Sequence, residues 1–231
     1  VYTFQLRPRQ HSLHTRVIFG VLRLMARWRL CLRVSDEESV TVLQHRHRTL
    51  SSRLVYIDQG WFQNYELIKH ALLRHLDFRD EVANAATDWF NSRSLHPGQC
   101  TFLHVRKGDY LTTFPDEVLP VSYFQAGMAL TRREGCTGPV IAASDDIEAI
   151  QDETLFSEAI TYVEESPAIT LAILSQCRAA VISNSSFAWV AGYMVARRGG
   201  FVVAPEYWLG WPRDQWYPPH IASDLFTYIK V

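Results

Sequence analysis

From residue 100 onward the sequence alternates short apolar runs with longer helix-forming stretches, and this alternation restricts the fold more than any other feature. The expected strands lie at residues 100–106, 138–144, 159–165, 178–183 and 199–205, and the expected helices at residues 122–134, 167–177 and 185–198. Strands that alternate with helices form a parallel sheet, and short apolar strands are typical of a sheet covered on both faces. We therefore expect an α/β fold.

The first part of the chain has a different charge balance. Residues 1–53 hold ten Arg and three acidic residues, a net charge of +7, whereas the remainder holds 13 basic and 21 acidic residues, a net charge of −8. Short strands over residues 40–57 and helices over residues 65–76 and 79–91 are expected before the Pro97-Gly98 loop. We place the domain boundary in that loop, which gives domains of residues 1–96 and 97–231.

Residues 16–34 form a basic segment with apolar residues at nearly helical spacing. A basic amphipathic helix can lie on an anionic membrane surface. An ordinary helix whose arginine stems cover apolar neighbours has the same pattern. Peripheral membrane contact and a structural role are therefore both open for this segment.

Composition excludes several classes of protein. The 231 residues are 48% apolar and 20% charged, as in globular proteins, and the net charge is −1. The sequence has no uninterrupted apolar run of membrane-spanning length, and we expect no nucleic-acid partner. The four cysteines lack metal-binding spacing, so we expect free thiols rather than disulfides or a metal site.

Polar clusters follow three of the expected strands. R-K-G-D begins with the last residue of the strand at 100–106, S-D-D with the last residue of the strand at 138–144, and S-N-S-S with the last residue of the strand at 178–183. In open parallel sheets, ligands bind at the carboxyl ends of the strands. If these strands are neighbours, the three clusters line one crevice.

Each cluster suits an anionic ligand but also has a structural interpretation. Asn184, Ser185 and Ser186 begin a helix, where backbone N–H groups bind anions, although Ser and Asn also cap ordinary helices. Arg106 suits bidentate contact with a phosphate, although R-K-G-D also fits a solvated charge cluster.

The S-D-D cluster contains Asp145 and Asp146. These two residues fit a contact with a base or ribose, a helix cap or, as the weakest alternative, a metal pair.

The ordered set H-V-R-K-G-D-Y, S-D-D and I-S-N-S-S-F-A-W resembles the motifs of the α-1,2-fucosyltransferases. V-Y-I-D-Q-G-W-F-Q-N-Y-E-L-I, V-L-P-V-S-Y-F-Q-A-G-M and F-V-V-A-P-E-Y-W-L-G-W resemble further segments of that family, so the resemblance covers residues 54–231. The chain departs from the family at Lys107, where the family has Arg, and at Ala188 and Val190, where it often has Ser and Trp. The family's G-G-L-G-N-Q element has no counterpart, so we expect the start of the first half to be missing.

The resemblance implies a GT-B-like fold with two Rossmann-like halves, residues 1–96 on the acceptor side and residues 97–231 on the GDP-fucose side. It implies transfer of L-fucose from GDP-fucose to the 2-hydroxyl of a galactoside, with inversion and without a metal or other cofactor. The implied donor-site residues are His104, Arg106, Lys107, Asp145, Asp146, Asn184, Ser185, Ser186 and Phe187.

Arg106 and Asp109 are the residues to which we assign catalytic roles. Arg106, assisted by Lys107, would hold the departing diphosphate together with Ser185 and Ser186. Asp109 is ranked first as general base, and Asp116 and Glu117 remain alternatives. His104 fits a core position and a donor contact equally well.

Two other functions are compatible with these departures from the family pattern. One is a catalytically inactive sugar-nucleotide-binding or scaffold protein, including one that acts mainly through the basic segment at a membrane. The other is an inverting fucosyltransferase with a different acceptor. A bacterial enzyme would work in the cytoplasm or at the cytoplasmic face of the inner membrane, and a eukaryotic one at the Golgi membrane.

Overall fold

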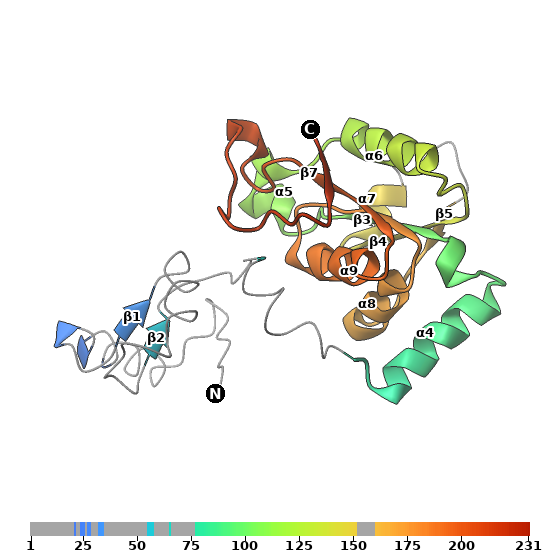
Figure 1. Cartoon of the computed structure of the whole chain (residues 1–231), viewed down its shortest axis with the longest axis horizontal. Helices are drawn as coiled ribbons and strands as arrows, with labels where there is room; N and C mark the ends of the chain where they lie inside the picture. Colours follow the sequence, from blue (N-terminus) through green and yellow to red (C-terminus); the bar gives the residue numbers. More distant parts are fainter. Residues whose placement is uncertain are drawn as a thin grey trace. The chain divides into compact units, whose positions relative to one another are not determined.

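The computed structural model divides the chain into two compact units, Val1–Gln63 and Asn64–Val231 (Figure 1). It describes residues 77–151 and 160–231, together with Tyr65, residues 55–57 and 32–34, and Val21, Leu24, Met25, Arg27 and Trp28. No helix in this described part is long and apolar enough to span a membrane.

The described residues of the first unit include a short parallel strand pair. Strand β1 (Leu32–Val34) pairs with β2 (Val55–Ile57). The helix expected over residues 16–34 is therefore wrong at its end, because residues 32–34 pair with a strand far along the chain. Val21, Leu24 and Trp28 are exposed, and Val21 and Leu24 are helical.

The second unit alternates helices and strands. After α4 (Asp80–Ser92) come β3 (Thr101–Val105), α5 (Tyr110–Thr113), α6 (Val121–Arg133), β4 (Val140–Ser144), α7 (Ile147–Gln151), β5 (Ile160–Tyr162), α8 (Pro167–Ser175), β6 (Ala179–Val181), α9 (Ser186–Ala196), β7 (Phe201–Pro205) and β8 (Thr227–Ile229). Short 3₁₀ turns lie at η2 (Pro97–Gln99), η3 (Pro115–Glu117) and η4 (Trp211–Arg213).

The strands form one parallel six-stranded sheet in the order β5-β4-β3-β6-β7-β8. The chain builds outward from β3 through β4 to β5, and then returns to the other side of β3 to add β6, β7 and β8. The order therefore reverses between β3 and β6. Ligands of doubly wound sheets bind outside the strand ends at such a reversal.

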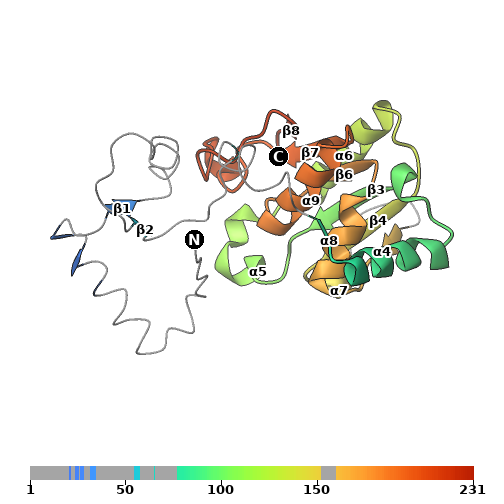
Figure 2. The ribbon, with the colours of Figure 1, turned by 60° about the horizontal axis from the view of Figure 1, so that its bottom comes forward.

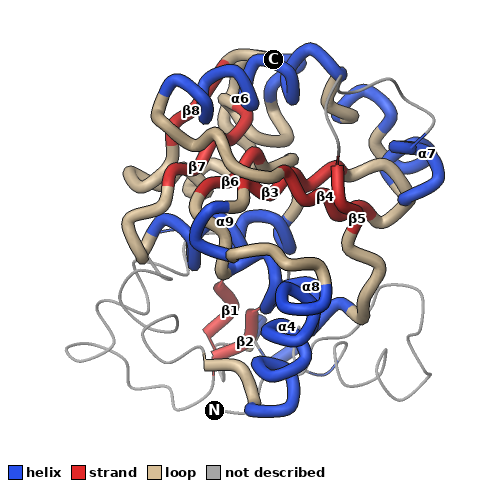
Figure 3. The backbone as a smooth tube through the Cα atoms, turned by 90° about the vertical axis from the view of Figure 1, so that its right-hand side faces the viewer, coloured by secondary structure: helices blue, strands red, loops and turns tan. Residues whose placement is uncertain are grey.

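Helices cover both faces of the sheet, as Figure 3 shows with α6 on one side and α9, α8 and α4 on the other. Helix α8 lies between α4 and α9 (Figure 2). Each face buries its own apolar cluster. Alternate strand residues point to opposite faces, so Val181 packs in the cluster beneath α6 and Ile182 in the cluster beneath α9.

The parallel α/β architecture expected for residues 97–231 is confirmed, and the expected strands from residue 100 each appear, within a few residues. Strand β8 was missed, because its short sequence is a strand only through pairing with β7. Cys100, Cys136 and Cys177 are free and buried, as expected, while Cys31 lies outside the described residues.

The second unit begins at Asn64 rather than at the Pro97-Gly98 loop. The physical reason is visible in α4, which precedes that loop but contacts α8 and buries Trp89 and Phe90 in the cluster beneath α9. The predicted helix at 65–76 lies outside the described residues except for helical Tyr65. The arrangement of two GT-B halves stays a prediction.

Candidate functional site

The candidate site lies at the carboxyl ends of β3 and β6, where the strand order reverses. Pairing continues past the end of β6, because the backbone N–H of Ser183 donates to the carbonyl of His104 at 3.1 Å. Arg106 and Ser185 each follow this pair by two residues. Clusters that are far apart in the sequence therefore emerge side by side from adjacent strands.

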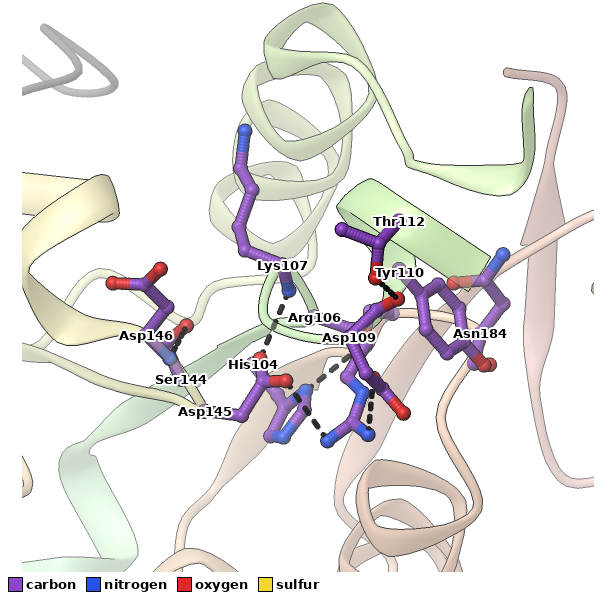
Figure 4. Close-up of polar contacts among 11 residues, drawn as sticks. His104, Arg106, Lys107, Asp109, Tyr110, Thr112, Ser144, Asp145, Asp146 and Asn184 are labelled. Carbon is purple, nitrogen blue, oxygen red and sulfur yellow. Dashed lines mark hydrogen bonds and ion pairs between the residues drawn. The ribbon is translucent and has the colours of Figure 1, made fainter. Parts of the chain in front are cut away.

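Arg106 stands at the centre of the cluster with its guanidinium between two carboxylates (Figure 4). Nη2 lies 2.6 Å from Asp109 Oδ1, and Nη1 lies 3.1 Å from Asp145 Oδ2. The guanidinium carbon also lies 5.3 Å from the centre of the Tyr110 ring. The Arg106 side chain is 27% exposed, so it is held in place yet accessible to a ligand.

Lys107 contributes differently from Arg106. Its backbone N–H donates to Asp145 Oδ1 at 2.9 Å. Its side chain points away from the guanidinium of Arg106 (Figure 4), as expected for consecutive residues leaving a strand. The assistance that we predicted from its ammonium group stays a prediction.

The two aspartates after β4 have different partners. Asp145 receives Arg106 and the Lys107 backbone, as described above. Asp146 Oδ1 accepts the backbone N–H of Ala149 at 3.1 Å, and the Asp146 N–H donates to Ser144 Oγ at 3.0 Å. Asp146 therefore acts as the cap of α7, and its predicted contact with the nucleotide stays a prediction.

His104 is buried at the base of the site. Its Nδ1 lies 2.8 Å from Ser183 Oγ, and its ring centre lies 5.6 Å from that of Phe187 on α9. Burial, together with the nearby positive charge of Arg106, lowers the pKa of His104 to about 3. The imidazole is therefore neutral at physiological pH, and its contact with Ser183 links the ends of β3 and β6.

Asn184 joins three segments by hydrogen bonds. Its Nδ2 donates to the Glu117 carbonyl at 2.8 Å, and its own carbonyl accepts Tyr110 Oη–H at 3.0 Å. Trp211 Nε1 also donates to the Glu117 carbonyl, at 3.3 Å. Burial raises the pKa of Tyr110 to about 12, so the phenol remains a donor. The amide of Asn184 is thus committed to linking loops.

Sequence reasoning missed Tyr110, Trp211 and Arg213 as parts of this region. Two signals were available: the Tyr that follows Asp109 in the first motif, and Trp211, the last residue of the F-V-V-A-P-E-Y-W-L-G-W segment. Arg213 carried no signal, because only folding brings η4 next to η3.

The beginning of α9 presents the third cluster. Ser185 is the N-cap residue of α9, but its side chain makes no capping hydrogen bond. Ser185 is buried and Ser186 is exposed. Backbone N–H groups at such a helix start can bind an anion, so this turn is suited to oppose Arg106 across a phosphate.

The three candidates for a general base differ in their surroundings. Asp109 is 58% exposed and paired with Arg106. Asp116 is exposed. Glu117 is largely buried, and its Oε1 lies 3.4 Å from Arg213 Nη2. Asp109 is the candidate nearest to the guanidinium, and its assignment stays a prediction.

The arrangement can bind a polyanion and stabilise charge that develops on it. A guanidinium and a helix start flank the switch point, and both favour negative charge. In the described part of the chain, no group of three or more His, Cys, Asp or Glu residues is arranged to hold a metal ion.

Comparison with known proteins gives a family match. The model of glycosyl transferase family 11 matches residues 43–216, which is more than half of the chain. The O-antigen biosynthesis glycosyltransferase WbnK of Escherichia coli is 27% identical over 163 residues, which are 64% of this chain and 54% of that protein. The chain thus spans about half the length of this relative.

Solved glycosyltransferases resemble the structure more distantly. Fucosyltransferase NodZ from Bradyrhizobium gives a TM-score of 0.46 at 16% identity, with 70% of this chain and 58% of that chain covered. The glycosyl transferase family 9 protein from Veillonella parvula DSM 2008 gives a TM-score of 0.45 at 12% identity, with 68% and 42% covered.

Proposed function

The chain belongs to glycosyl transferase family 11, and we propose that it transfers L-fucose from GDP-fucose to the 2-hydroxyl of a galactoside with inversion. The observation that carries this proposal is the guanidinium of Arg106, fixed at the switch point beside the first turn of α9. A diphosphate is the part of the donor that needs such a site.

The proposed reaction exchanges one bond for another. The acceptor 2-hydroxyl oxygen attacks C1 of fucose, while the bond from C1 to the β-phosphate oxygen breaks and its electron pair leaves with GDP. The hydroxyl proton passes to a general base, for which we propose Asp109. Attack opposite to the departing phosphate inverts C1.

The proposed role of Arg106 is to stabilise the charge that develops on the β-phosphate as the bond breaks. Preorganised donors of this kind supply much of the rate enhancement in such sites. The first-turn N–H groups of α9 with Ser185 and Ser186 would act from the other side. Because these groups supply hydrogen-bond donors to the β-phosphate, we propose that the transfer proceeds without a metal ion.

The proposed acceptor is a galactose-containing glycan of a bacterial surface polysaccharide. The name of the Escherichia coli relative, an O-antigen biosynthesis glycosyltransferase, supports this class of acceptor. Such an enzyme would work at the cytoplasmic face of the inner membrane. Exposed Val21, Leu24 and Trp28 within the basic segment support peripheral contact with an anionic membrane surface there.

Titration and turnover test the proposal together. GDP and GDP-fucose are titrated calorimetrically in EDTA, and fucose transfer to galactosides is followed by mass spectrometry, with the linkage assigned by NMR. We expect Arg106→Ala to reduce turnover by about 10²–10³-fold or more, the typical effect of removing one such donor. Arg79→Ala is the control, because Arg79 is exposed and paired only loosely with Glu81 at 3.8 Å.

The outcomes separate the candidate functions. Near-normal turnover by Arg106→Ala would refute the diphosphate role. GDP binding without transfer to any acceptor would favour a sugar-nucleotide-binding protein. Transfer to a hydroxyl other than the galactoside 2-hydroxyl would retain the fucosyltransferase and replace the acceptor.

A further inference from the structure

Asp145 holds the loop that carries Arg106 with both of its carboxylate oxygens. Oδ1 accepts the backbone N–H of Lys107 at 2.9 Å, and Oδ2 lies 3.1 Å from Arg106 Nη1. Asp145 follows β4, whereas Arg106 follows β3, so the contact crosses between adjacent strand ends. The orientation of Arg106 is therefore set by a residue from another strand.

Gly108 shows how closely the loop wraps this carboxylate. A Cβ at Gly108 would lie 2.1 Å from Asp145 Oδ2 and 2.8 Å from its Cγ. The carboxylate could not move away freely, because its two oxygens are bound to Lys107 and Arg106. Glycine at this position therefore permits the contact between Asp145 and Arg106.

Asp109 binds the same guanidinium in a different way. It contacts only the other nitrogen, Nη2, at 2.6 Å, and its side chain is 58% exposed, compared with 22% for Asp145. Asp109 also begins α5 without forming a side-chain cap. Its carboxylate can therefore rotate into solvent without losing a capping hydrogen bond.

The charges around Arg106 restrict how a diphosphate can bind. One guanidinium faces two carboxylates, so this group of three carries a net charge of −1 when all are ionised. An arriving diphosphate would be repelled by both carboxylates, each of which already contacts one terminal nitrogen of the guanidinium. Withdrawal of one carboxylate would relieve part of this repulsion and would end the competition for one terminal nitrogen.

We propose that Asp145 is the positioning residue that keeps Arg106 in place, and that Asp109 is an exchangeable counter-ion that gives up Nη2 to the diphosphate. This inference rests on the proposed function. The exchange releases the Asp109 carboxylate beside the bound donor, where it can accept the proton of the acceptor hydroxyl. Donor binding would thus prepare the base, and the acceptor would react second.

The same substitution at the two aspartates should have opposite effects on GDP affinity. Asp145→Asn should raise the Kd for GDP about tenfold or more, because the charged hydrogen-bond partner that fixes Arg106 and the Lys107 backbone is lost. Asp109→Asn should lower the Kd by up to about fivefold, the usual worth of an exposed ion pair that no longer competes. Turnover at saturating donor should fall in both variants.

Two matched controls separate positioning from general effects of charge or folding. Glu148→Gln removes one exposed carboxylate from α7. Its Kd for GDP should stay within about twofold of that of the unsubstituted chain. Gly108→Ala should weaken GDP binding as Asp145→Asn does, without changing any charge. Gly98→Ala should not, because nothing lies within 4 Å of the added Cβ. Thermal unfolding of each variant confirms that it is folded.

The measurements distinguish failure of this inference from failure of the proposed function. If the unsubstituted chain neither binds GDP nor transfers fucose, the proposed function fails. If it does both and Arg106→Ala abolishes them, but the two aspartate variants change the Kd in the same direction or not at all, the exchange is wrong. Opposite shifts, together with weak binding by Gly108→Ala, would establish it.

Discussion

At the scale of single residues, the site depends on how burial changes acid–base chemistry. His104 is a histidine inside a sheet, 4% exposed, with Ser183 as its hydrogen-bond partner and Arg106 nearby. Taking a positive charge into this position is unfavourable, which lowers its pKa to about 3. The neutral ring can pack beneath Arg106 without repelling it.

This environment predicts a loss of stability in acid. Below a pH of about 6.5, the unfolded chain binds a proton at His104 that the folded chain excludes. The free energy of unfolding should therefore fall as pH decreases from about 6.5 towards 3, by up to about 1.4 kcal/mol per pH unit from this residue. Urea unfolding at pH 7.0, 5.5 and 4.5 should show that the free energy of unfolding decreases less steeply with falling pH for His104→Gln than for the unsubstituted chain. Equal slopes would show that His104 does not titrate in this way.

Single residues also show where prediction from the sequence stops. The motif identified Arg106 and Asp109, and the structure brings them together. The sequence did not indicate that Asp145 would face Arg106 while Asp146 caps α7, because the two aspartates are consecutive in the S-D-D cluster. Side-chain direction at a strand end depends on the turn that follows and on the neighbouring strand.

At the scale of elements, α6 packs closely on the face of the sheet to which Val181 and Val203 point. A Cβ at Gly127 would lie 2.6 Å from Cγ1 of Val181 and 3.5 Å from Cγ1 of Val203. Helix α6 is also held by Tyr123 Oη, which donates to the carbonyl of Ile182 at 2.7 Å. This hydrogen bond lies one residue before Ser183, at the floor of the site.

Gly127→Ala should consequently destabilise the protein, although alanine favours helices by up to about 1 kcal/mol. Overpacking of a core typically costs about 1–3 kcal/mol, and Val181 cannot withdraw because its backbone is part of the central strand β6. Val181→Ala in the same chain should recover part of the loss. Denaturant unfolding of the two single variants and the double variant measures this coupling, and simple additivity would contradict the predicted contact.

Element type was predictable where pattern and length agreed. The run at 101–105 is buried throughout in β3, and its largely apolar sequence indicated a buried strand. By contrast, α5 is a single short turn within a loop, and β8 depends on its pairing with β7. Such elements are formed by tertiary contacts rather than by local preference.

At the scale of the whole molecule, the two compact units have separate proposed roles. Residues 64–231 contain the sheet, both apolar clusters and the candidate site. Residues 1–63 contain the basic segment with exposed Val21, Leu24 and Trp28. GDP binding should therefore belong to residues 64–231, and membrane contact to residues 1–63.

A fragment of residues 64–231 should unfold cooperatively and bind GDP within about threefold of the full chain, because both cores and the site are retained. It should lose the binding of the full chain to vesicles that contain anionic lipid. Circular dichroism during heating, calorimetry and vesicle sedimentation measure these properties, with neutral vesicles as the control. Equal vesicle binding by both proteins would exclude the basic segment as the contact.

The sequence by itself determined the alternation of strands and helices, and it determined which residue types stand at the strand ends, because periodicity and composition are local properties. Only the tertiary structure decided the strand order. That order places β6 beside β3 and so brings Arg106 next to the start of α9. It also decided that Asp145 binds Arg106 and that α4 belongs with the sheet. These outcomes follow from contacts between distant segments, whose energies depend on packing that no single stretch of sequence contains.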